Sequence, residues 1–382
     1  MWKTVATHTD INDENQTVHV PKIRTNAIDS ETRTHTSKMD GSMTIIDTVS
    51  YENLIPGFTY VLEGYLMDKP RSDSTAVNGL KIKDKDGNYI TNRIEFTPDK
   101  PNGSVQLHLQ GNASEFQTDE GSFSSETLVV FERLYLKDNK DSSDELLIVA
   151  NHEDINDENQ TIYCPTISTK VAAYDLGEVT KDGYADHVLG AVAYECDNCK
   201  TRFVGELEAQ AHIRDNRICM NNTPSGKSGY SSVTEVTIYD MVHYENLIPN
   251  RTYSVVGHII DTKTGESVLI NQRQVQSEQK YFTPGSPNGD VQVVFHVTGI
   301  DLAGGRYVIY EELFLDGVSI AKHKSFYDDN QTFYVPRMAT SVKDDNTKTN
   351  IIKSGTISTI TDTVEISGLK EGQKYRFFYI NS

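Results

Sequence analysis

Short runs in which hydrophobic and polar residues alternate recur along nearly the whole chain. Residues 105–109 read Val-Gln-Leu-His-Leu and residues 291–295 read Val-Gln-Val-Val-Phe, as expected for strands with one buried face. Turn-forming pairs such as Pro-Gly, Asn-Gly and Asp-Gly separate these runs. Helical periodicity is nearly absent outside one segment. The pattern predicts an all-β chain of antiparallel sandwich domains, most simply of the Ig-like kind.

The pattern also repeats along the chain. The octapeptide DINDENQT at residues 10–17 recurs at 154–161, and residues 44–56 recur in closely similar form at 237–249. The intervals from Gln16 to Gln160 and from Gln160 to Gln331 each have the length of a whole domain. We therefore expect four segments: the last strand of a truncated domain (1–21), two complete domains (22–164 and 166–335), and the N-terminal part of a truncated following domain (336–382).

Composition excludes several classes of function. The chain has 36 basic and 55 acidic residues and a net charge of −19, which disfavours nucleic acids and anionic membrane surfaces as partners. No apolar run approaches the roughly 18 residues that indicate a membrane-spanning helix, so we expect no membrane insertion in this segment. Four cysteines in 382 residues cannot form a disulfide framework. No signal peptide or sorting motif is recognisable.

The second complete domain carries an insertion near its beginning. Thr25 and Asp47 differ by 22 in residue number, whereas the equivalent Thr169 and Asp240 differ by 71. The difference is 49 extra residues, which we place mostly between about 178 and 232. This segment contains the one expected helix, which runs from about residue 206 to residue 212.

Three of the four cysteines lie in the insertion together with one histidine. Cys196 and Cys199 form a C-x2-C pair, His212 follows after twelve residues and Cys219 after six more. This spacing indicates a zinc-finger-like segment with a structural Cys3His zinc site, which would let the insertion fold with almost no hydrophobic core. The alternatives are a loop with scattered cysteines or a Cys196–Cys199 disulfide. Cys164 lies outside this cluster, and we expect it to be a packed thiol.

Five polar positions recur in the same order in both complete domains. The acids end hydrophobic strand runs, where a polar residue is either an edge feature or buried and paired. Two carboxyls buried together force one pKa upwards, which leaves a neutral acid that can donate a hydrogen bond. The alternative is that all five are surface or cap residues of β-domains. The two sets are Thr25, Asp68, Glu132, His152 and Gln160, and Thr169, Asp261, Glu311, His323 and Gln331.

These sets resemble a known family. Together with the motifs VVFE at 129–132 and YENLIPG at 51–57, and with a histidine eight residues before each glutamine, they resemble the Thr–Gln ester-bond domains (VaFE-type repeats) of Gram-positive surface adhesin stalks. The resemblance implies an Ig-like fold in which a threonine on the first strand and a glutamine on the last become joined by a self-catalysed ester, without a cofactor. It predicts two esters, Thr25–Gln160 and Thr169–Gln331.

The resemblance also implies a role for each remaining residue. His152 and His323 would be the general bases that take the threonine hydroxyl proton. The pairs Asp68/Glu132 and Asp261/Glu311 would share a proton and polarise the glutamine amide carbonyl. Gln16 and Thr340 have no partner of the opposite kind in this chain, so they are expected to be unpaired in it. Each domain would react once, so the chain is not an enzyme in the usual sense.

Three hypotheses about function follow. The first is a structural stalk fragment of a cell-wall-anchored adhesin at the cell surface, with neighbouring stalk domains of the same chain as its partners and a host ligand bound by other domains. The second is a binding module for a host ligand or partner that acts through the zinc-bearing insertion. The third is a multiple-turnover hydrolase, which predicts an open cleft and an exposed threonine nucleophile.

Overall fold

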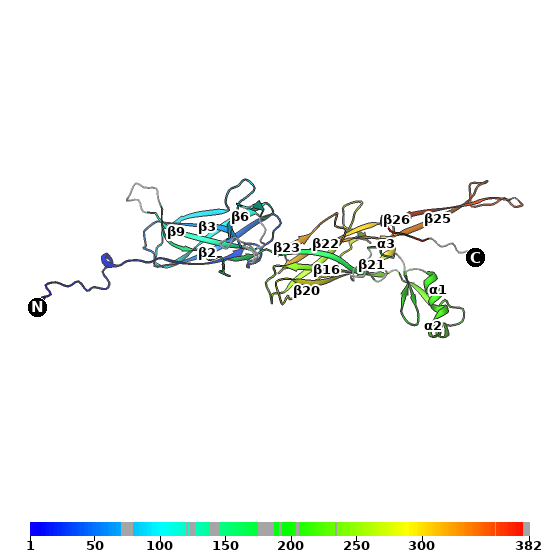
Figure 1. The fold of residues 1–382 in the computed structure, drawn as a ribbon, viewed down its shortest axis with the longest axis horizontal. Coiled ribbons are helices and arrows are strands. Elements are labelled where there is room, and N and C mark those ends of the chain that lie inside the picture. Colours follow the sequence, from blue (N-terminus) through cyan, green and yellow to red (C-terminus); the bar gives the residue numbers. More distant parts are fainter. Residues whose placement is uncertain are drawn as a thin grey trace. The chain divides into compact units, whose positions relative to one another are not determined.

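The computed structural model describes residues 1–69, 79–119, 121–122, 127–137, 146–174, 187–190, 193–203, 206–233, 235–355 and 357–376. The chain divides into two compact units, which are Met1–Pro165 with Asn246–Ile248, and Thr166–Glu245 with Pro249–Ser382. In each unit, antiparallel strands form a sandwich of two sheets, accompanied by smaller sheets, which confirms the predicted all-β, Ig-like architecture (Figure 1). Among the described residues, no helix has the length and apolar character needed to cross a bilayer.

In the first unit, a sheet of three strands faces a larger sheet. The three-stranded sheet has the order β1 (Lys22–Asp29), β2 (Ser42–Glu52), β6 (Gly103–Asn112). The larger sheet has the order β10 (Leu147–His152), β9 (Thr127–Leu136), β3 (Tyr60–Asp68), β4 (Leu80–Lys81), with β11 (Thr161–Tyr163) on β9 and β5 (Thr91–Phe96) on β3. The short elements are η1 (Glu14–Gln16), η2 (Ala113–Glu115), β7 (Gln117–Thr118) and β8 (Gly121–Ser122).

The sandwich of the second unit repeats this topology. Its three-stranded sheet has the order β12 (Thr166–Tyr174), β16 (Glu235–Glu245), β21 (Gly289–Thr298). The facing sheet has the order β20 (Lys280–Phe282), β17 (Tyr253–Asp261), β22 (Arg306–Leu315), β23 (Val318–His323), with β24 (Thr332–Tyr334) on β22. A hairpin of β18 (Leu269–Ile270) and β19 (Arg273–Gln274) and the short helix α3 (Gly299–Leu302) complete it.

The alternating sequence pattern decides which side chains enter the core. In β1, the side chains of Ile23, Thr25 and Ala27 are buried while the residues between them are exposed. In β2, Asp47 is fully buried between Ile45 and Val49. Polar residues therefore stand at inward positions of otherwise apolar strands, and the hydrophobic core surrounds them.

A glycine on each central strand lets the two sheets approach closely beside these residues. Gly64 of β3 lies opposite Glu132 of β9, and a Cβ atom there would lie 2.8 Å from Leu107 Cδ1. Gly257 of β17 takes the same place opposite Glu311, and its Cβ would lie 2.4 Å from Cζ of the buried Phe295. The absence of a side chain at these positions gives the opposing core residue its space.

The segment after the first strand of each unit locates the insertion. In the first unit, Thr36 forms a parallel bridge with Tyr163, just after β1 and before β2. In the second unit, Val188 forms the same bridge with Tyr334. Aligned on these bridges, 8 of the 49 extra residues precede the bridge and 41 follow it, between residues 189 and 235. The expected insertion range of about 178–232 contains most of this segment, and its residues 178–186 lie outside the described part of the chain.

The insertion forms a small separate fold. It consists of a three-stranded sheet in the order β14 (Arg202–Phe203), β13 (Ala193–Cys196), β15 (Tyr230–Val233), with helices α1 (Glu206–Asp215) and α2 (Arg217–Asn222) (Figure 1). Helix α1 contains the predicted helical segment. The backbone of Ala193 pairs with that of Val233, so the two ends of the insertion meet.

The outer segments of the chain are simpler. Residues 1–21, all described, contain only η1, so the last strand expected there is not formed. The equivalent strands β11 and β24 pair with β9 and β22, and residues 1–21 have no such partner strand among the described residues. At the other end, β25 (Arg337–Asp344) and β26 (Ile360–Ser367) form a two-stranded hairpin that repeats the pairing of β1 with β2.

Candidate functional site

The predicted threonine and glutamine of the second unit meet on one buried carboxyl group. The Thr169 hydroxyl donates a hydrogen bond to Oε2 of Glu311 at 3.1 Å, and the Gln331 Nε2 donates to the same oxygen at 2.7 Å. Thr169 comes from β12, Glu311 from β22, and Gln331 directly precedes β24. Glu311 and Gln331 are fully buried and Thr169 is 6% exposed. The first strand of the sandwich and the segment before the last strand therefore bring the predicted threonine and glutamine side chains together.

The first unit has the same arrangement with one difference. Gln160 Nε2 donates to Oε2 of Glu132, and both residues are fully buried. Thr25 is 9% exposed, and its hydroxyl has no hydrogen-bond partner among the described residues. Neither threonine is the exposed nucleophile in an open cleft that a hydrolase would need.

The acid beside each glutamate is not the aspartate that was predicted. Asp47 of β2 acts on Glu132, whose pKa its negative charge raises, and Asp240 of β16 acts on Glu311 in the same way. Asp47 and Asp240 are both fully buried. The carboxyl pairs at the site are therefore Asp47/Glu132 and Asp240/Glu311.

The predicted pairing of Asp68 with Glu132 and of Asp261 with Glu311 is wrong because of the strand register. Asp68 lies opposite Leu128, four residues along β3 from the position that faces Glu132. Asp261 lies four residues along β17 from the position that faces Glu311. At about 3.4 Å per residue, four residues separate the carboxyls by roughly 14 Å along the strand. Asp68 and Asp261 are thus outside the site.

Burial and mutual repulsion keep a proton on each carboxyl pair. Burial raises the pKa of Asp47 to about 6. Burial, followed by repulsion from Asp47, raises the pKa of Glu132 well above its usual range. The pKa of Asp240 is raised by burial, and that of Glu311 by burial and by Asp240. Two buried acids in contact do not both ionise near neutral pH, so each pair holds a neutral acid that can donate a hydrogen bond.

Each predicted histidine lies at the site and has an aspartate partner. His152 faces Glu132 across β10 and β9, and its Nε2 lies 2.7 Å from Oδ2 of Asp157. His323 faces Glu311 in the same way, and its Nε2 lies 3.1 Å from Oδ2 of Asp328. The positive charge of each histidine, when protonated, would favour the ionised form of the nearby Asp47 or Asp240. The side chains of both histidines are about one-fifth exposed, 23% and 20%.

The same aspartates also shape the turn that presents each glutamine. Asp157 Oδ1 accepts from the backbone N–H of Asn159, and Asp157 O accepts from the N–H of Gln160 and from the Thr161 hydroxyl. Asp328 makes the equivalent bonds in the second unit. The acidic loop is therefore an aspartate-stabilised turn that directs the following glutamine into the core.

The sequence contains signals for the aspartates that were not predicted. An aspartate occurs three residues before each glutamine, as Asp13, Asp157 and Asp328. In the two sequence repeats that carry no insertion, an aspartate also follows the threonine at one fixed spacing, as Asp47 follows Thr25 and Asp362 follows Thr340. Asp47 stands at an inward position of an alternating strand, which is the pattern expected of a buried acid.

The cysteines of the insertion converge with His212. The ligand atoms of Cys196, Cys199, His212 and Cys219 all lie within 4.8 Å of one another. Cys199 Sγ is 3.2 Å from His212 Nε2. Ligands held tetrahedrally about 2.0–2.3 Å from a zinc ion lie roughly 3.5–3.8 Å apart, so the cluster has the size of such a site. The structure thus places all four predicted ligands together. Cys164 is fully buried in the core of the first unit, as predicted.

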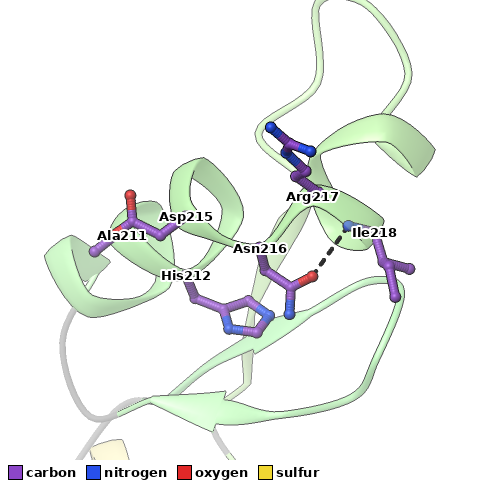
Figure 2. A pocket seen from close by; sticks show the side chains of 6 residues that line it. All are labelled: Ala211, His212, Asp215, Asn216, Arg217 and Ile218. Carbon is purple, nitrogen blue, oxygen red and sulfur yellow. Dashed lines mark hydrogen bonds between the residues drawn. The ribbon is translucent and has the colours of Figure 1, made fainter.

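Local hydrogen bonds hold the ligands in place. The Cys196–Cys199 turn closes through Lys200 N–H, which donates to Cys196 O at 3.0 Å, with Lys200 in the left-handed region at φ 61°. Asn216 caps α2 by accepting from the N–H group of Ile218 at 3.1 Å (Figure 2). It also accepts from the N–H group of Cys219 at 3.3 Å. Figure 2 also shows the open hollow beside this cap, lined by Ala211, His212, Asp215, Asn216, Arg217 and Ile218.

One protein family matches the chain. Its description is "T-Q ester bond containing domain", and it matches residues 1–20, 21–164, 209–335 and 336–378. Residues 165–208, which include β12 with Thr169 and the Cys196–Cys199 pair, lie between the second and third matches. No match was found among curated proteins.

Comparison with solved structures gives only weak likenesses. A bacterial adhesin from Mobiluncus mulieris, containing intramolecular disulfide, isopeptide and ester bond cross-links, is 14% identical, with 92% of this chain and 99% of that chain covered and a TM-score of 0.29. A second crystal form of that adhesin is 13% identical, with 91% and 96% covered and a TM-score of 0.28. A β-glucuronidase of glycoside hydrolase family 2 is 10% identical, with 79% and 25% covered and a TM-score of 0.22.

Proposed function

Because the chain belongs to the family of T-Q ester bond containing domains, we propose that it is a stalk segment whose two complete domains, 22–164 and 166–335, each form one intramolecular ester. The esters join Thr25 to Gln160 and Thr169 to Gln331. The observation that carries this proposal is that the Thr169 hydroxyl and the Gln331 amide both hydrogen-bond to one buried oxygen of Glu311.

The chemistry is a single acyl transfer. The histidine takes the proton of the threonine hydroxyl, and Oγ1 attacks the glutamine Cδ. The new Cδ–Oγ1 bond forms, the Cδ–Nε2 bond breaks, and the nitrogen leaves as ammonia after it gains a proton. Asp157 and Asp328 hold the imidazole of His152 and of His323 in place through their contacts with Nε2. No cofactor takes part in this sequence.

The carboxyl pair has a position suited to the leaving group. In both units the glutamate accepts a hydrogen bond from the amide nitrogen of the glutamine. The sequence had led us to expect that the carboxyl pair polarises the amide carbonyl instead. A neutral acid at this position would deliver the proton that the leaving nitrogen needs. The exclusion of water from the buried site would then protect the ester from hydrolysis.

The ester would make each domain resistant to force and to proteases. Gln160 and Thr169 are nine residues apart in the chain, so tension would pass from one ester to the next through a short covalent path. Residues 1–21 would supply His8, Asp13 and Gln16, and residues 336–382 would supply Thr340 and Asp362, to further domains of the same kind. A stalk of such domains fits a protein of the bacterial cell surface, with neighbouring stalk domains as its partners.

Intact-mass measurement tests the cross-links. The folded chain should be lighter than its sequence by two molecules of ammonia, one for each ester. Thr25→Val and Thr169→Val should each restore one ammonia, and the double variant should restore both. A folded chain with the full sequence mass would contradict the proposal.

We also propose that the Cys3His cluster holds one structural zinc ion, with Cys196, Cys199, His212 and Cys219 as its ligands. All four coordination positions would come from the protein, which is the arrangement of a structural and not a catalytic zinc site. Metal analysis of the purified chain should give one zinc per molecule. Replacement of residues 190–234 by a short link should remove it, and a chain without bound zinc would refute this assignment.

A further inference from the structure

The insertion has almost no hydrophobic interior of its own. Among its described side chains between residues 193 and 233, the buried ones that are apolar or sulfur-containing are Cys196, Ala209 and Cys219. Two of these three are candidate metal ligands. A segment of this size buries too little apolar surface to fold by itself, so we expect its order to depend on the proposed zinc site.

The insertion is joined at both ends to segments that carry the second ester site. Before it, Leu189 N–H donates to Tyr334 O at 2.8 Å, and His187 Nδ1 lies 2.7 Å from Thr332 O. Thr332 directly follows the reacting Gln331. After it, β15 leads into β16, which carries Asp240 and pairs with β12 beside Thr169. The insertion thus connects residues 187–189, which are bonded to β24, with β16, which pairs with β12.

In the first unit, four residues make this connection. Residues 38–41 lead from Ser37, which is bonded to Tyr163, to the start of β2. In the second unit, residues 190–234 make it. When the insertion is folded, the pairing of Ala193 with Val233 brings its two ends together, so that it acts as a short link. When it is unfolded, all of residues 190–234 become one long loop between the same two points.

We propose that metal binding by the insertion controls how fast the second domain assembles its ester site, so that the Thr169–Gln331 ester forms in a zinc-dependent manner and the Thr25–Gln160 ester does not. This inference rests on the proposed esters and on the proposed zinc site. Loop-closure entropy increases with the logarithm of loop length, and closing a loop of about 45 residues in place of a four-residue link reduces the probability of closure by up to roughly 40-fold. We expect the rate to fall on the order of tenfold without metal.

The experiment follows each ester separately during refolding. The Thr25→Val chain can form only the second ester, and the Thr169→Val chain only the first. Each chain is unfolded from inclusion bodies in guanidinium, its full sequence mass is checked at zero time, and it is refolded with zinc or with EDTA. Loss of ammonia is then followed by intact mass, and bound zinc by metal analysis.

We expect the second ester to form slowly in EDTA and fast in zinc. The first ester should form at the same rate in both. Two further variants in the Thr25→Val background sharpen this. In the Cys199→Ser variant, the second ester should form slowly even with zinc. Replacement of residues 190–234 by Lys-Met-Asp-Gly, the sequence of residues 38–41, should be fast even in EDTA.

The possible failures can be told apart. If no ammonia is lost under any condition, the ester proposal fails. If both esters form but no zinc is bound, the zinc proposal fails. If zinc is bound and the second ester forms equally fast with zinc and with EDTA, the cross-link and the metal site stand and the coupling between them is overturned.

Discussion

Replacing Thr25 with valine should remove the first ester with little other change. Valine keeps the β-branched shape and nearly the volume of threonine, and the Thr25 hydroxyl has no hydrogen-bond partner among the described residues that would be lost. The ester would close the loop from Thr25 to Gln160, which contains most of the first domain. The chain-entropy relation for a cross-link that closes a loop of roughly 135 residues gives about 5 kcal/mol of stabilisation.

This stabilisation corresponds to a large shift in the melting temperature. A domain of about 140 residues unfolds with an entropy of about 0.3 kcal/mol/K, so about 5 kcal/mol is equivalent to ~17 °C. Calorimetry of the Thr25→Val chain should show the transition of the first unit lowered by about this amount, with the second unit unchanged. Intact mass should show the return of one ammonia.

Thr340→Val is the matched control. Thr340 is the third copy of this threonine but is exposed and lacks a glutamine partner in this chain, so its replacement should change neither the mass nor the transitions. If Thr25→Val restores one ammonia but leaves the melting temperature within a few degrees of the parent, the account of the ester as a loop-closing cross-link is refuted. If it restores none, the assignment of Thr25 is refuted.

Three further predictions concern the carboxyl pair and the core beside it. Asp47→Asn should slow formation of the first ester by a factor on the order of 10² while Asp68→Asn leaves it unchanged, as followed by intact mass during refolding. In the Thr25→Val chain, the free energy of unfolding of the first unit should fall as the pH rises from about 4 to about 6. The reason is that the pKa of Asp47 is raised to about 6 in the folded state, whereas the unfolded state releases that proton at lower pH. Urea titrations should show this slope, and Asp47→Asn should flatten it. Gly257→Ala should destabilise the second unit by about 1–3 kcal/mol in urea unfolding, since its Cβ would lie 2.4 Å from a buried phenylalanine ring, whereas Gly285→Ala, with no atom within 4 Å of the added Cβ, should not.

The fold and most residues of the candidate site could be predicted because the alternation of a strand's sequence shows directly which face is buried. Strict alternation around Thr25 and the apolar run before Glu132 place both side chains in the core, and the structure agrees. The repeated spacing between histidine and glutamine corresponds in the structure to a turn before each glutamine. These features are local, so one sequence is enough to show them.

The incorrect prediction of Asp68 and Asp261 shows that a local sequence pattern does not give the register between strands. Asp68 and Glu132 do lie on the same face of neighbouring strands, because Asp68 is opposite Leu128 and Glu132 is four residues away on β9. Alternation gives the face of a strand but not the register between two strands that are about 60 residues apart in the chain. That register decides which acid meets Glu132, and it favours Asp47 from the opposite sheet.

The register that the two units share also explains how the second domain accommodates 49 extra residues. Glu132 faces Gly64 and His152, and Glu311 faces Gly257 and His323 in the same register. Across the other sheet, Thr25 lies opposite Val49, as Thr169 lies opposite Val242. The register of β12 on β16 shifts between Val171 and Ala173, which β1 and β2 do not show, but the pairing at Thr169 itself is the same as at Thr25. The candidate ester site therefore keeps the same pairing around Thr169, Glu311 and His323 despite the insertion. We therefore expect the metal of the insertion to affect the rate at which the strands reach this pairing, and so the kinetics of the proposed cross-link and not its final geometry.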